Sequence, residues 1–122
     1  MIQSIKKVLL VDDDEGIQEA IKALLEHEGF QILIAATERE AVKLIKHKSP
    51  EIILMDFLLG SSNGASVAQK LKGNKKTQHI PIIIMSAHHE AKLSAEKCGA
   101  DDFLAKPFDI DELLEKINRY TT

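Results

Sequence analysis

The sequence contains one cysteine, Cys98, and this scarcity excludes two common kinds of stabilisation. An intrachain disulfide needs two thiols, and a structural zinc site needs further Cys or His ligands at fixed spacings, which the residues around Cys98 do not offer. We expect Cys98 to be a small buried residue near a helix end and not a reactive thiol. An ordinary hydrophobic core must therefore hold the fold together.

Long hydrophobic runs and long basic runs are also absent. The first apolar run, residues 8–11, ends at four consecutive acids and is far too short for a signal-peptide core or a membrane span. The net charge is −3, and the lysines of "KGNKK" (72–76) are expected to form a solvated helix end, with a docking patch as the alternative. We therefore expect a cytoplasmic protein with no membrane insertion and no direct contact with nucleic acid.

What the 122 residues do contain is an alternation of short apolar runs with longer amphipathic ones. The apolar runs predict five strands, at 8–11, 32–35, 52–55, 82–85 and 103–105. Apolar and polar residues alternate too little in these runs for a sheet with one solvent-exposed face, so we expect both faces to be covered. Helical spacing is clearest at 17–25, 41–45 and 113–117, and we expect a crossover helix for each strand. The sequence thus predicts an α/β domain, a doubly wound five-stranded parallel sheet with helices on both faces.

Polar residues follow four of the five predicted strands. In chain order they are Asp12 and Asp13, Asp56, Ser86 and Lys106. Ligands of a doubly wound sheet bind at the carboxyl ends of its strands, so we expect these groups to converge there. Three carboxylates and one ammonium leave two negative charges, which one divalent cation cancels.

Mg2+ suits this set because it prefers oxygen ligands and keeps several waters. Asp13 and Asp56 would bind it directly and Asp12 through a water. An aspartate also serves as a nucleophile toward phosphorus, forming an aspartyl phosphate. Ser86 would then donate a hydrogen bond to one phosphoryl oxygen and Lys106 would pair with another.

Each residue alone has a more ordinary interpretation. Asp13 or Asp14 could cap the following helix. Asp56 could bind a ribose in a nucleotide fold, although acids follow the first strand where such a fold needs glycines. Lys106 could be a surface lysine and Ser86 a turn residue. Only the joint pattern favours phosphoryl transfer.

Four segments, "VLLVDDD", "IILMD", "IIIMSA" and "GADDFLAKPF", resemble the receiver domain of bacterial two-component response regulators in sequence and spacing. The resemblance covers essentially the whole chain, so we interpret residues 1–122 as one receiver domain. It implies a flavodoxin-like fold with strand order 2-1-3-4-5 that accepts a phosphoryl group from a sensor histidine kinase or a phosphotransfer protein. It also implies that a downstream protein binds the face made by the fourth helix, fifth strand and fifth helix.

The same resemblance implies a role for each site residue. Asp56 would be the phosphoacceptor, Ser86 the switch hydroxyl and Lys106 the lysine that pairs with the phosphate. Phe103 would be the aromatic switch residue, and the Lys106-Pro107 peptide bond would be cis. The implied ligands of Mg2+ are Asp12, Asp13, Asp56 and the main-chain carbonyl of Leu58. Catalysis would be limited to self-phosphorylation and slow self-dephosphorylation.

One position departs from the family, and two other functions compete. Gly60 stands where family members often have proline, which predicts a more mobile loop after Asp56. Asp12 and Asp14 form a D-x-D after a strand, as in a phosphohydrolase with an aspartyl nucleophile, but that architecture generally needs a longer chain. A flavin or nucleotide module of similar fold would need a glycine-rich phosphate loop, so we expect no organic cofactor.

Overall fold

A computed structural model describes residues 5–60, 62–88 and 90–121. Its main sheet has five parallel strands in the order β2-β1-β3-β6-β7. The bounds of these strands are β1 (Lys7–Val11), β2 (Gln31–Ala35), β3 (Ile52–Asp56), β6 (Ile82–Ser86) and β7 (Asp102–Ala105). Each is one residue longer than its predicted apolar run, and the order 2-1-3-4-5 is confirmed once the main-sheet strands are counted along the chain.

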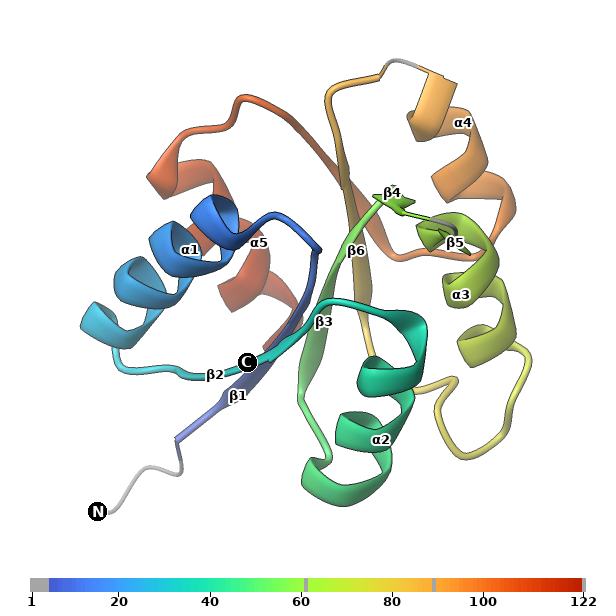
Figure 1. The fold of residues 1–122 in the computed structure, drawn as a ribbon, viewed down its shortest axis with the longest axis horizontal. Helices are drawn as coiled ribbons and strands as arrows, with labels where there is room; N and C mark the ends of the chain where they lie inside the picture. The colour runs from blue at the N-terminus through green and yellow to red at the C-terminus, as the bar shows by residue number, and fades with distance from the viewer. Residues whose placement is uncertain (1–4, 61, 89, 122) are drawn as a thin grey trace.

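Helices cover both faces of the sheet, as predicted (Figure 1). One face carries α1 (Glu15–His27) and α5 (Ile110–Thr121), and the other carries α2 (Glu38–Lys48), α3 (Gly64–Lys72) and α4 (Glu90–Lys97). Successive strand residues point to opposite faces, so the core has two halves. Over the described residues, no helix is both long enough and apolar enough to cross a membrane.

Burial explains why the strands read as unbroken apolar runs. All five residues of β6 are buried, because the strand lies inside the sheet with helices above and below it. Fully burying one Ile or Leu side chain contributes roughly 1.5–3 kcal/mol, so these strands supply much of the stability. Cys98 is buried, and its Sγ lies 3.1 Å from the carbonyl oxygen of Ala95, in line with a packing role.

The starts of two helices follow the expected capping chemistry. The Asp14 carboxylate accepts a hydrogen bond of 3.1 Å from the N–H of Ile17 and caps α1. The Thr37 hydroxyl accepts one of 3.2 Å from the N–H of Glu40 at the start of α2. Because Asp14 caps α1, Asp13 does not, and the Asp13 carboxylate can take part in a site at the strand ends.

Two features differ from the sequence-based expectation. Residues after β3 form a short antiparallel hairpin, β4 (Leu58–Leu59) and β5 (Ser62–Asn63), with Gly60 at φ 59° between the two strands. Val42, one of the apolar residues that give 41–45 its helical spacing and were therefore expected on the buried face, is 48% exposed. Ala41 and Ile45 occupy that buried face, and Val42 lies beside it on the flank of the helix.

Candidate functional site

Three acidic side chains meet at the carboxyl ends of β1 and β3. Carboxylate oxygens of Asp12, Asp13 and Asp56 all lie within 4.8 Å of one another. The two strands are hydrogen-bonded neighbours with Val11 opposite Met55, so the residues that follow each strand are brought side by side. The predicted convergence of these acids is therefore present in the fold.

Lys106 follows β7 and reaches across to the acids. Its Nζ lies 2.9 Å from Oδ1 of Asp56 and 3.4 Å from Oδ2 of Asp12. Burial alone would lower the pKa of Lys106, but the hydrogen bond to Asp56 and the charges of both acids outweigh it and leave the pKa above its usual value. The lysine is thus a permanent cation that partly balances the three carboxylates.

Asp12 is the most enclosed of the acids, with only 1% of its surface exposed. Its Oδ1 accepts a hydrogen bond of 2.9 Å from the N–H of Asp14, and its main-chain oxygen accepts one of 2.6 Å from Nε2 of Gln18. Burial raises the pKa of Asp12, and the nearby charge of Asp56 adds to the rise. Sequence reasoning missed Gln18, because a glutamine in the second turn of a helix carries no signal of such a contact.

Ser86 lies at the end of β6 and is 3% exposed. Its hydroxyl accepts a hydrogen bond of 3.0 Å from the N–H of His88, and its carbonyl accepts one of 2.9 Å from the N–H of Lys106. The second bond fixes the strand ends of β6 and β7 to each other. Ser86 is one residue further along β6 than Met85, which pairs with Asp56, so its main chain borders the acids.

Phe103 lies on β7 opposite Ile84 of β6, and so further from the carboxyl ends of these strands than Ser86 and Lys106. It is half-buried and packs against the half of the core under α2, α3 and α4. The Lys106-Pro107 peptide bond is cis, as the resemblance implied. Phe103 and Ser86 thus lie on two paired strands that both end at the acids.

Gly64, the first residue of α3, was not predicted to border the site. Its N–H donates a hydrogen bond of 2.8 Å to the carbonyl of Phe57. A Cβ added to Gly64 would lie 2.2 Å from the main-chain oxygen of Asp56 and 3.0 Å from Cγ of Met55. Only glycine therefore lets α3 begin so close to Asp56, and the Asn-Gly pair at 63–64 is the signal that could have shown it.

These groups form a site with anionic oxygens on one side and a fixed cation on the other. The three clustered carboxylates suit a hard divalent cation such as Mg2+, whose ligands are oxygens. Lys106 is placed to pair with a second anionic group that binds next to Asp56. The arrangement can bind a metal ion and a phosphoryl group together.

Comparisons with known proteins agree with this chemistry. The sequence profile of the response regulator receiver domain family matches residues 8–118. The phosphate regulon transcriptional regulatory protein PhoB of Pseudomonas aeruginosa is 36% identical over 92% of this chain and 50% of its own length. Protein PilH of the same organism is 32% identical over 92% of this chain and 94% of its own length.

One solved structure with the same fold contains a metal ion in its own active site. It is the receiver domain of the sensor histidine kinase PA1611 from Pseudomonas aeruginosa, with a magnesium ion coordinated in its active site cleft. The TM-score is 0.88 at 28% identity, and the match covers 97% of this chain and 98% of that one. The chain spans about half the length of PhoB and of several other curated relatives that it matches.

Proposed function

The chain belongs to the response regulator receiver domain family and is therefore a phosphoacceptor signalling domain, and we propose that Asp56 is its acceptor in a Mg2+-dependent reaction. The observation that carries this proposal is that the Asp56 carboxylate lies within 4.8 Å of the other two acids and 2.9 Å from the Lys106 ammonium. A carboxylate in that position can hold the metal with one oxygen and attack phosphorus with the other.

The proposed reaction is an in-line displacement. An oxygen of Asp56 forms the bond to phosphorus while the bond from phosphorus to the imidazole nitrogen of a phosphohistidine donor breaks, and the imidazole keeps that electron pair. Asp12, Asp13, Asp56 and the main-chain carbonyl of Leu58 would hold Mg2+, which would supply positive charge to offset that of the phosphoryl group. Lys106 moves from its contact with Oδ1 of Asp56 to a phosphoryl oxygen.

The switch would start at Ser86. Its hydroxyl accepts a hydrogen bond from His88 at present and would turn to donate one to the phosphoryl group. Phe103, half-buried on the neighbouring strand, would then move into the space that Ser86 leaves. In this proposal, phosphorylation changes the surface of α4, β7 and α5.

The environment of Asp12 and Asp14 disfavours the competing phosphohydrolase. In that function, the D-x-D pair would supply the nucleophile and the acid. Asp12 is instead buried and bonded to the main chain, and Asp14 caps α1. We therefore propose that catalysis is limited to self-phosphorylation and slow self-dephosphorylation of Asp56.

Partners follow from the same proposal. A sensor histidine kinase or a phosphotransfer protein in the cytoplasm would supply the phosphoryl group, and a downstream protein would bind the face of α4, β7 and α5. Two large apolar side chains are exposed on the helices of that face, Leu93 at 61% and Ile110 at 55%. These exposed apolar side chains could contact a protein partner. We propose no direct role for nucleic acid or membrane.

Acetyl phosphate provides a direct test. Incubation with acetyl phosphate and Mg2+ should add one phosphoryl group by intact mass, and Asp56→Asn should abolish the addition. Asp111→Asn, an exposed acid on α5, is the matched control and should be modified like wild type. Modification that persists in Asp56→Asn, or maps to another residue in the wild-type protein, would show that the acceptor is misassigned.

A further inference from the structure

Charge is divided unevenly between two parts of this acidic chain. Residues 38–80 contain eight Lys and Arg against four Asp and Glu, whereas the rest of the chain contains eight against fifteen. From residue 57 to residue 89 there is no acid at all. The positive part includes α2 and α3, which lie next to each other on one face of the sheet (Figure 1).

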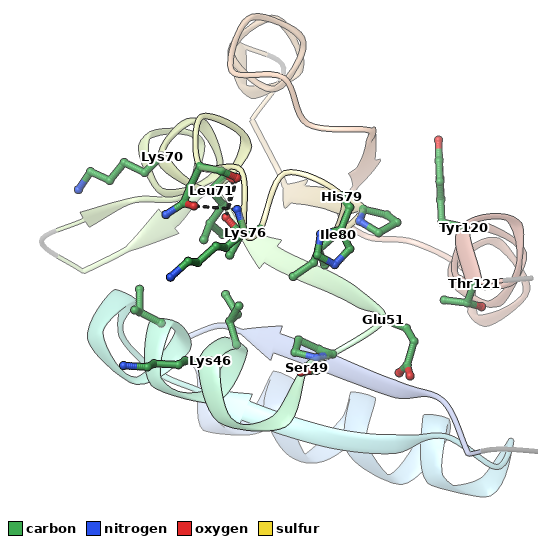
Figure 2. A pocket seen from close by; sticks show the side chains of 16 residues that line it. Lys46, Ser49, Glu51, Lys70, Leu71, Lys76, His79, Ile80, Tyr120 and Thr121 are labelled. Atoms are coloured by element: carbon green, nitrogen blue, oxygen red, sulfur yellow. Dashed lines mark hydrogen bonds between the residues drawn. The ribbon is translucent and has the colours of Figure 1, made fainter.

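The surface between α2 and α3 is hollowed on this positive part. A hollow of about 880 Å3 lies at the amino ends of β3 and β6, at the opposite end of the sheet from Asp56 (Figure 2). Its apolar lining residues include Val42, Ile45, Leu71 and Ile80, of which Val42 is 48% exposed and the other three are buried. One acid, Glu51, also lines this hollow. A second hollow of about 530 Å3 shares Val42 and extends along α2 toward Thr37 and Ser62.

The two hollows together form one groove, here called the α2–α3 groove, lined by Val42, Ile45, Leu71 and Ile80 and flanked by the lysines described next. It follows α2, whose eleven residues make it about 16 Å long. Val42, at 48% exposure, lies where the two hollows meet. An elongated groove with an apolar lining suits a peptide segment better than a compact molecule.

Lysines line both sides of the groove. Lys46 comes from α2, while Lys70 and Lys76 come from α3 and the loop after it (Figure 2). Within the described residues, the ammonium groups of Lys46 and Lys76 contact no acid or other hydrogen-bonding group. Lys70 forms an ion pair of 3.1 Å with Glu38, and this pair joins the two helices across the groove.

A compact anion such as free phosphate fits this surface poorly. The lysines are spread along the groove and do not converge on one point. They match several carboxylates that are themselves spaced along a chain.

We propose that the α2–α3 groove binds an acidic amphipathic segment of a partner protein. Apolar side chains of the segment contact the exposed side chain of Val42, and its carboxylates pair with Lys46 and Lys76. The surface is separate from the face of α4, β7 and α5 and from the acids around Asp56. The domain can therefore hold a second partner while Asp56 is being phosphorylated.

The test uses the whole chain and a synthetic helical peptide of roughly 14 residues, with Leu on one face and Glu on the other. Fluorescence anisotropy of the labelled peptide gives its affinity, and amide NMR shifts give its position. The peptide should shift residues along α2 and α3. Lys46→Gln with Lys76→Gln should weaken binding about fivefold.

Two further variants make the test specific. Lys22→Gln with Lys92→Gln removes the same charge from exposed positions on α1 and α4 and should leave the affinity unchanged. Glu38→Gln frees Lys70 and removes one of the two acids that line the groove, the other being Glu51, so binding should become about twofold tighter. A substitution that merely disturbed the local structure would not increase the affinity for the peptide.

Several outcomes would overturn the proposal. Equal weakening in the control pair, or equal binding of an all-Glu peptide without leucines, would mean that the protein attracts anions in general and that the groove does not recognise an amphipathic segment. Equal binding of a peptide with Gln in place of Glu would remove the role of the lysines. Shifts confined to α4, β7 and α5, or self-association of the protein that Lys46→Gln with Lys76→Gln abolishes, would assign the contact to another face or to a second copy of this chain.

Discussion

The Lys106 ammonium lies 2.9 Å from Oδ1 of Asp56, so the cation of the site contacts the carboxylate that is proposed to receive the phosphoryl group. The same nitrogen lies 3.4 Å from Oδ2 of Asp12. Lys106 therefore acts as the counter-ion of the acids before a metal or a phosphoryl group binds. Mg2+ has to share those acids with it.

This competition gives a prediction about metal affinity. Lys106→Ala should leave Mg2+ binding unchanged or tighten it by up to about tenfold, because a nearby positive charge is removed. Asp13→Ala should abolish binding, because it removes a carboxylate of the cluster. Titration of both variants with Mg2+ measures the difference. Equal loss in the two would contradict the proposed ligand set.

Gly64 gives a prediction about how closely α3 approaches the acceptor. In Gly64→Ala the new Cβ would meet the main-chain oxygen of Asp56, so we expect unfolding to become easier by about 2 kcal/mol and phosphorylation to slow. Gly73→Ala is the control, since its Cβ meets nothing closer than 3.3 Å and its φ of −84° suits alanine. Urea unfolding and the rate of phosphorylation, measured for both variants, test this prediction. Similar values for the two would mean that α3 can move away without cost.

Phe103 gives a prediction about the conformational switch. Its ring lacks the hydroxyl that would favour a solvent-facing position, so the equilibrium should lie closer to the active form than with tyrosine. Beryllofluoride, a phosphoryl mimic, should shift NMR signals mainly within residues 86–110. Phe103→Tyr, which starts further from the active form, should show larger shifts when both proteins are saturated. Changes restricted to the loop after Asp56 would argue against a switch through Ser86 and Phe103.

The lifetime of the phosphorylated state should depend on Leu58. Hydrolysis needs a water in line with phosphorus, and Leu58 follows the acceptor closely, is 52% exposed and offers no group to orient that water. We expect a long-lived phosphoprotein, and we expect Leu58→Asn to shorten its lifetime. The lifetime is measured as the loss of phosphoprotein with time after the donor is removed, for the wild type and the variant at the same Mg2+ concentration. Unchanged or slower decay in the variant would show that water access at Leu58 does not set the rate.

Asp102 gives a prediction about stability and pH. Burial raises its pKa, but hydrogen bonds from Lys116, the N–H of Phe103 and Tyr120 outweigh that effect and leave the pKa below its usual value. A lowered pKa means that the ionised carboxylate stabilises the fold above about pH 4, and that this contribution is lost as the pH falls through the folded-state value. Asp102→Asn should therefore lower the free energy of unfolding by about 2 kcal/mol at pH 7 and by much less at pH 3. Urea unfolding at the two pH values tests this, and an equal loss at both would exclude ionisation as the cause.

The sequence predicted those parts of the molecule that depend on local pattern. The strands are apolar because both faces of the sheet are covered, and the acids meet because the carboxyl ends of parallel strands share an edge. The hairpin at 58–63 escaped prediction because two-residue strands have no detectable period. Val42 escaped it because exposure on a helix flank depends on tertiary packing. Gln18 escaped it because its sequence position carries no signal of a hydrogen bond to the main-chain oxygen of Asp12.

The division of charge between residues 38–80 and the rest of the chain also affects how partners approach. A molecule that is positive on one part and negative on the other has an electric dipole, which orients it in the field of a charged partner before the two surfaces touch. Association with a strongly charged partner should therefore be fast and mostly correctly oriented at low ionic strength. Near physiological salt, where the screening length is about 8 Å, that guidance acts only during the last few ångströms of the encounter.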